Sequence, residues 1–172
     1  MFDEHDENAF PLAYLITVRC YGTWLHGDER GSVDRHGYNL YGADRRVANQ
    51  KLQDAMTRNM KQASILLDEN QREIVKNAVV EVCRYRGYEM LALNVRTNHF
   101  HVVVSAQTQP EPIADDFKRY ATRALRKAEF IGDGITPWVR GKSRRYLWKP
   151  RHVELAVDYV LFGQGDEIPE FD

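Results

Sequence analysis

The sequence predicts an α+β fold: an antiparallel sheet with helices on one face and one further helix at the C-terminal end. Short segments rich in β-branched and aromatic residues alternate with longer segments whose apolar residues recur at helical spacing. Two of the strand-like segments, 88–95 and 99–105, are separated by only three residues, so they must be antiparallel neighbours. A chain of 172 residues is long enough to form one domain with a substantial core.

The composition is that of an ordinary globular protein, with 43% hydrophobic and 28% charged residues. No apolar run approaches the roughly 20 residues that span a bilayer. Segment 1–8 is acidic, unlike a secretory signal, and Cys20 and Cys83 fit reduced thiols of a cytosolic core. We therefore expect a cytoplasmic protein, 1–172 as a single domain, without a membrane partner and with flexible acidic ends at 1–10 and 165–172.

The net charge of −1 hides a strong segregation of charge. Between Phe117 and Arg151 there are eleven lysines and arginines, against only Glu129 and Asp133. Such an excess is typical of a surface that binds a polyanion, although a solvated basic face would give the same count. The basic residues cover a helix and the segment after it, which favours nucleic acid as the partner.

The first elements are predicted in the N-terminal third of the chain. Residues 13–21 are rich in β-branched and aromatic side chains and predict a strand. Residues 22–43 carry five glycines and have the composition of a long loop, in which His26 and His36 fit surface residues better than ligands. Residues 44–61 predict a polar helix that packs only lightly.

A stronger helix is predicted to begin after Asp68. Asp68 and Gln71 have the spacing of a capping box, and Gly87 lies where a left-handed residue commonly ends a helix. Between these ends six apolar residues fall on one helical face: Ile74, Val75, Ala78, Val79, Val82 and Cys83. The hairpin formed by 88–95 and 99–105 follows this helix.

Another amphipathic helix is predicted over 113–130, after a polar linker that contains Pro110 and Pro112. An edge strand is then expected at the end of 138–148, and a short helix over 152–162. The resulting order of strand, helix, strand, strand, helix, strand, helix matches a ferredoxin-like split βαβ sheet with an added C-terminal helix. Strand 99–105 would then be a central strand of this sheet.

That strand begins with two histidines. Because side chains alternate along a strand, His99 and His101 point to the same face, where two imidazoles can hold a divalent metal ion. The spacing alone equally fits an inert, hydrogen-bonded pair. A metal held there would polarise a phosphate oxygen, and a tyrosine hydroxyl could attack the phosphorus to give a covalent phosphotyrosine.

The basic region combines phosphate-binding and stacking side chains. Arginine and lysine neutralise phosphates, while tryptophan and tyrosine stack on unpaired bases, a mixture that suits single-stranded DNA or hairpin ends. The aromatics of 138–148 would otherwise only pack on the sheet. The candidate DNA-binding residues are Lys118, Arg119, Tyr120, Arg123, Arg126, Arg144, Arg145 and Trp148, and Trp138 is a further candidate for stacking.

The motif His99-Phe100-His101 resembles the histidine, hydrophobe, histidine signature of HUH endonucleases. With Asn98 before it and three valines after it, the strand is similar to the NHxHxxV strand of IS200-like transposases and REP-associated tyrosine transposases. The resemblance covers about residues 12–164. Three later stretches also match the family's pattern: Phe117-Lys118-Arg119-Tyr120, Leu147-Trp148, and Tyr159-Val160-Leu161-Phe162-Gly163-Gln164.

The resemblance implies a single-tyrosine transposase that cleaves and rejoins single-stranded DNA through a phosphotyrosine, acting in the cytoplasm and on the nucleoid when bound to DNA. It implies His99, His101 and Gln164 as ligands of Mg²⁺ or Mn²⁺ and Tyr159 as the nucleophile. Gln164 departs from the family's pattern, because it follows Tyr159 by five positions rather than four, and each residue turns a helix by about 100°. Many proteins of this kind are homodimers, in some of which the tyrosine of one subunit serves the metal of the other.

Several alternatives remain open from the sequence. Tyr120 competes with Tyr159 as the nucleophile, although its place in an apolar stripe fits a packing residue. The chain could be a ferredoxin-like nucleic-acid binder without catalytic activity, a metalloenzyme that does not act on DNA, or a domesticated nuclease that acts on chromosomal repeats.

Overall fold

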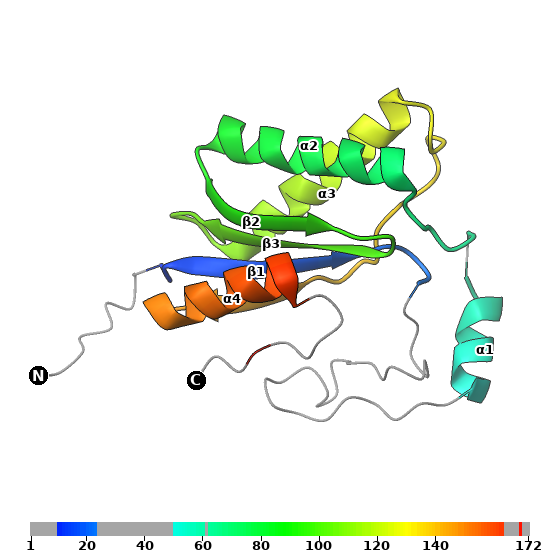
Figure 1. Cartoon of the computed structure of the whole chain (residues 1–172). Coiled ribbons are helices and arrows are strands. Elements are labelled where there is room, and N and C mark those ends of the chain that lie inside the picture. The colour runs from blue at the N-terminus through cyan, green and yellow to red at the C-terminus, as the bar shows by residue number, and fades with distance from the viewer. Residues whose placement is uncertain (1–9, 24–49, 61, 164–168, 170–172) are drawn as a thin grey trace, which may run out of the picture.

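The computed structural model describes residues 10–23, 50–60, 62–163 and 169. Four strands form one antiparallel sheet in the order β2-β3-β1-β4. Their bounds are Ala13–Arg19 for β1, Glu89–Val95 for β2, His99–Ser105 for β3 and Ser143–Leu147 for β4. This confirms the predicted α+β fold, with the histidine strand β3 in the centre and β4 at an edge (Figure 1).

Helices cover both faces of the sheet. In Figure 1, α2 (Glu69–Arg86) and α3 (Pro110–Lys127) lie on one side of the strands and α4 (Pro150–Phe162) lies on the other. The larger core fills the α2–α3 face, and the smaller one lies under α4. The polar helix α1 (Gln50–Arg58) buries none of its residues, as its composition predicts. The predictions for 22–43 and for both chain ends fall largely outside the described residues.

Both predicted ends of α2 are confirmed. The Asp68 carboxylate accepts a hydrogen bond from the Gln71 backbone N–H at 2.8 Å, and the Gln71 side chain accepts one from the Asp68 N–H at 2.9 Å. Gly87 ends the helix with φ of 71°, a left-handed conformation that glycine adopts without steric cost. These contacts satisfy backbone groups that the helix itself leaves without partners.

The prediction for the start of α3 is wrong by three residues. Pro110 and Pro112 lie in the first turn of the helix rather than in a linker before it, and the helix ends at Lys127 rather than at Phe130. Proline suits a first turn, because its fixed φ is helical and its missing N–H would have no partner inside the helix.

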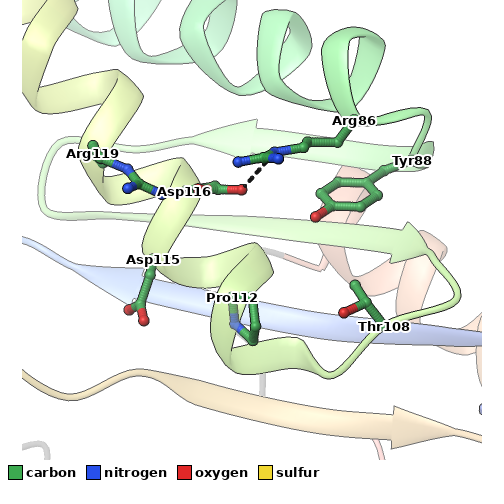
Figure 2. Close-up of a pocket in the computed structure, with 7 residues that line it drawn as sticks. All are labelled: Arg86, Tyr88, Thr108, Pro112, Asp115, Asp116 and Arg119. Atoms are coloured by element: carbon green, nitrogen blue, oxygen red, sulfur yellow. Dashed lines mark hydrogen bonds and ion pairs between the residues drawn. The ribbon is translucent and has the colours of Figure 1, made fainter.

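A buried carboxylate joins α2 to α3. Asp116 is only 3% exposed, and it accepts a hydrogen bond from Arg86 Nε at 3.0 Å and forms an ion pair with Arg119. These groups line an open cavity of about 650 Å³ at the C-terminal end of α2 (Figure 2). Because the cavity lies on the α2–α3 face, the sheet separates it from the side chains of His99 and His101. Asp116 pairs with both arginines of the cavity, and Asp115 pairs with Lys142 beside it, which indicates a structural role.

Replacing Asp116 with Asn is expected to lower the free energy of unfolding by about 1–3 kcal/mol, because the variant keeps the shape but loses the charge that holds two guanidinium groups. Urea denaturation measures this change. The matched control is Asp115→Asn, whose carboxylate is 60% exposed and pairs with Lys142, so a loss below about 1 kcal/mol is expected. Equal losses in the two variants would contradict the role given to Asp116.

Candidate active site

The two histidines lie side by side on the face of the sheet that α4 covers, called the histidine face below. Their ring centroids are 4.6 Å apart with an interplanar angle of 71°. His101 is 4% exposed, whereas His99 is only half-buried. On the same face, Thr17 of β1 and Asn94 of β2 are the register partners of His101, and Arg19 is the partner of His99. The prediction that the two rings share a face is confirmed.

A hydrogen bond holds one nitrogen of each ring. Thr17 Oγ1 lies 2.7 Å from His101 Nδ1, and Asn98 Oδ1 lies 2.6 Å from His99 Nδ1. An amide oxygen only accepts hydrogen bonds, so His99 Nδ1 carries a proton, and in the neutral ring Nε2 then has the lone pair. Hydrogen bonds of this kind orient histidines that bind metals through the other ring nitrogen.

The surroundings of His101 keep its ring neutral. Its pKa is lowered from 6.5 to about 3, chiefly by burial and also by the nearby His99, Arg19 and Arg96. A neutral imidazole is the form that binds a metal ion.

This pKa shift makes the stability of the fold sensitive to acid. Below pH 6.5 the unfolded chain binds a proton at His101, whereas the folded chain keeps this ring neutral. The free energy of unfolding therefore decreases as the pH falls from about 6.5 toward 3. At pH 5 the expected loss relative to pH 7 is about 2 kcal/mol. Urea denaturation at both values, compared with His101→Gln, measures it. If the variant shows as steep a loss as the parent, His101 is not the cause.

Helix α4 brings Tyr159 to the histidines. The Tyr159 ring is 9% exposed, and its centroid lies 5.3 Å from that of His101. Apolar residues of α4 anchor the helix, because Ala156 and Val160 are fully buried against the strands. The predicted nucleophile and the two histidines predicted as metal ligands therefore lie close together within one chain.

Two further contacts fix the end of α4. Asn94 Nδ2 donates a hydrogen bond to the Val160 backbone oxygen at 3.0 Å, which ties the turn that holds Tyr159 to the strand beside His101. A Cβ atom at Gly163 would lie 3.2–3.3 Å from backbone and ring atoms of Tyr159. Glycine therefore leaves room for the tyrosine at this point.

The third predicted ligand, Gln164, lies outside the described residues. Among the residues that the structure does describe, no three His, Cys, Asp or Glu side chains come together as a metal-binding group. Sequence reasoning also missed Thr17 and Asn94 as neighbours of the histidines, and it did not predict the hydrogen bond between Asn98 and His99. Strand pairing counted outward from the predicted three-residue turn would have placed Leu93 opposite His101. In the structure Arg96 N–H donates to His99 O at 2.8 Å, which shifts the register by one residue and pairs Asn94 with His101.

The predicted DNA-binding residues do not form one continuous face. On β4, Arg145 is the register partner of Leu15 on the histidine face, whereas Arg144 points to the other face and pairs with Glu111 at 2.5 Å. Arg119 pairs with Asp116 on the α2–α3 side. Their contact with DNA stays a prediction.

The remaining side chains of α3 have partners within the protein. The Lys118 ammonium donates to the backbone oxygens of Val139, Arg140 and Gly141 at 2.9–3.3 Å, and burial lowers its pKa. It therefore fastens the segment that leads into β4. Arg126 donates to the Ile135 oxygen at 3.1 Å, and the Arg123 guanidinium lies 5.2 Å from the centre of the half-buried Tyr120 ring.

The prediction that Trp138 stacks on bases is wrong. Its side chain is 3% exposed and contacts the Phe100 ring edge-to-face at 5.4 Å. Its indole N–H donates to Lys118 O and Thr122 Oγ1, each at 3.1 Å. A tryptophan beside basic residues in the sequence can thus face the core when its N–H finds a partner there. Trp148, by contrast, is 49% exposed.

Comparisons with known proteins identify similar chains. A family model described as "Transposase IS200 like" matches residues 51–153. A solved structure of a REP-associated tyrosine transposase bound to a REP hairpin is 13% identical, with a TM-score of 0.52, and the alignment covers 93% of this chain and 70% of that one. A candidate transposase of Deinococcus radiodurans R1 is 12% identical, with a TM-score of 0.46 and coverage of 92% and 95%. No curated protein matches the chain. None of the helices in the described part of the chain is long and apolar enough to cross a membrane.

Proposed function

Because this chain belongs to the IS200-like transposase family, we propose that it cleaves and rejoins single-stranded DNA through a covalent bond between Tyr159 and a DNA phosphate. The observation that carries the proposal is the 5.3 Å separation of the Tyr159 and His101 rings. These residues are 58 positions apart in the sequence, and the packing of α4 on the histidine face brings them together.

The reaction is a phosphoryl transfer. The Tyr159 oxygen forms a bond to phosphorus, its proton leaves to solvent or a base, and the bond from phosphorus to one DNA oxygen breaks to give a free hydroxyl. The new phosphotyrosine keeps the energy of the diester. A DNA hydroxyl can therefore reverse the step and reseal a strand without ATP.

We propose that His99 and His101 would hold a divalent metal, Mg²⁺ or Mn²⁺, through their Nε2 atoms. The donor set fits, because Thr17 and Asn98 engage both Nδ1 atoms and the His101 ring stays neutral. Such an ion, when bound, polarises a phosphate oxygen and orients the diester. Gln164 stays the proposed third protein ligand.

The proposed substrate is single-stranded DNA with hairpin ends. The solved relative is bound to a REP hairpin, and this chain carries a basic segment after α3. A homodimer also stays a proposal. Since Tyr159 and the histidines of one chain already meet, a second copy is not needed to assemble them.

The direct test is incubation of the protein with labelled single-stranded hairpin DNA, with and without Mg²⁺ or Mn²⁺. A metal-dependent band that survives denaturing electrophoresis is expected. Binding without any adduct would favour a nucleic-acid binder, and no binding at all would favour a metalloenzyme that does not act on DNA.

The position of the nucleophile is expected to depend on Asn94. Asn94→Ala removes the bond to Val160 O and frees the last turn of α4, so adduct formation should slow by about 10- to 100-fold, as displacements near 1 Å can cause. Single-turnover kinetics at saturating DNA measure this rate, and hairpin affinity should stay the same.

The matched control is Asp68→Ala, which removes the α2 cap at a cost of about 1 kcal/mol far from Tyr159. It should leave the rate unchanged. If both variants slow adduct formation equally, Asn94 acts through general stability and does not position the tyrosine.

A further inference from the structure

Two exposed aromatic rings stand side by side along the edge of the sheet. Tyr146 on β4 is 39% exposed and Trp148, two residues on, is 49% exposed. Their ring centroids are 6.3 Å apart and their planes differ by only 13°. Residues two positions apart in an extended segment point to the same side, which places the two rings next to each other.

A contact with the buried ring of Tyr14 fixes the orientation of Tyr146. The buried ring of Tyr14 contacts Tyr146 edge-to-face at 5.2 Å, with an interplanar angle of 77°. The Tyr14 hydroxyl in turn donates to the Thr108 backbone oxygen at 2.9 Å. The rings are therefore held in place before any ligand arrives, which lowers the entropic cost of binding.

The chain segment that carries the pair is strongly basic. Segment 140–151 contains six basic residues and no acidic one: Arg140, Lys142, Arg144, Arg145, Lys149 and Arg151. Asp115 and Glu111 of α3 pair with Lys142 and Arg144 at 2.5 Å each. Counting those two carboxylates still gives a net charge of +4, which suits a polyanion.

We propose that Tyr146 and Trp148 form a stacking platform for unpaired bases of the DNA strand that flanks the cleavage point. Each ring offers a flat apolar face, and every base can stack on it regardless of sequence. Bases inside a duplex are already stacked on one another, so the platform would take single-stranded DNA in preference to a hairpin stem. This inference rests on the proposed function.

Tyr146 is the register partner of Tyr14, which packs in the α2–α3 core, so the platform lies at the β4 edge on the face opposite the histidines, and DNA would reach it around that edge. Only β1 lies between β3 and β4, so the edge is roughly 10 Å from the histidine strand at about 4.8 Å per strand. Arg145, on the histidine face of β4, lies between the two places. A strand whose phosphate rests at His99 and His101 would cross Arg145 and turn over the edge onto the rings.

Binding in EDTA, without cleavage, tests the platform. Fluorescence anisotropy would compare a labelled hairpin that carries a single-stranded flank with the same hairpin made blunt. Trp148→Ala and Tyr146→Ala should each weaken binding of the flanked hairpin by about 5- to 100-fold, leave the blunt one unchanged, and keep the slope of affinity against salt. Trp148→Phe should retain most of the affinity, because it keeps a ring.

The matched control is Tyr85→Ala, which removes a 72% exposed ring from α2 without changing charge. Losses no larger than in this control, or equal losses on flanked and blunt hairpins, would overturn the proposal. So would a change of oligomeric state in light scattering, since β4 would then be an interface with a second copy. If the protein forms no adduct but still binds the flanked hairpin more tightly than the blunt one, the platform is supported and the proposed strand transfer is contradicted.

Discussion

Tyr159→Phe is expected to abolish the covalent protein–DNA adduct, with a loss of at least about 10³-fold in the rate of its formation. The variant removes the one oxygen that would bond to phosphorus, and phenylalanine keeps the ring packed against His101. Denaturing electrophoresis with labelled hairpin DNA and Mn²⁺ measures the adduct. Hairpin affinity and the unfolding midpoint should stay close to those of the parent.

The matched control is Tyr120→Phe. Tyr120 packs against the core of the α2–α3 face and lies beneath Arg123, so the sheet separates it from the histidines. Its variant should form the adduct at nearly the normal rate. An adduct that persists in Tyr159→Phe and disappears in Tyr120→Phe would show that Tyr120 is the nucleophile and that Tyr159 is a packing residue.

Mixing two inactive proteins tests whether one chain supplies both halves of the site. Tyr159→Phe and His101→Ala together should form no adduct, because the tyrosine and histidines of a single chain already meet. Activity restored by mixing would show that α4 of one subunit serves the histidines of another.

His99→Ala and His101→Ala are each expected to weaken Mn²⁺ binding by at least about 100-fold and to eliminate the adduct. Changes to groups that merely orient a ligand already cost 10- to 100-fold in metal affinity, so losing a ligand should cost at least as much. Isothermal titration with Mn²⁺ alone measures the affinity without DNA. His99 is the cleaner position, because it is half-buried and its removal leaves no closed cavity.

Thr17→Val serves as the graded control for the same measurement. It keeps the side-chain shape but removes the hydroxyl that holds His101 Nδ1, so a loss of about 10-fold is expected. If both histidine variants keep full Mn²⁺ affinity, the histidines are not metal ligands, and they form an inert, hydrogen-bonded pair.

Local patterns in the sequence were sufficient for the elements and for part of the site. Alternation along a strand put His99 and His101 on one face, and capping chemistry set both ends of α2. The order of elements predicted the sheet with β3 in its centre. The place of Tyr159 came from the family resemblance, since nothing in its own neighbourhood distinguishes it from a core aromatic.

Some local sequence patterns fit two different structures equally well, and only the tertiary structure distinguishes between them. Pro110 and Pro112 suit a linker and a first helical turn alike, and the packing of Ile113 and Phe117 on the sheet selected the turn. Trp138 and Trp148 both lie among basic residues, yet one is buried and the other exposed. The difference depends on whether the α3 groups Lys118 O and Thr122 Oγ1 accept the indole N–H.

By itself, then, the sequence determined that His99 and His101 share one face of a strand, because side-chain type and strand periodicity are properties of neighbours along the chain, whereas Tyr159 was singled out only by the family resemblance. Only the tertiary structure decided which of these residues meet. The contacts of His101 with Thr17 and Tyr159, and of Asn94 with Val160 O, join segments 58 to 84 positions apart. Such contacts depend on how α4 and the strands bury their apolar faces together, and no local pattern records that choice.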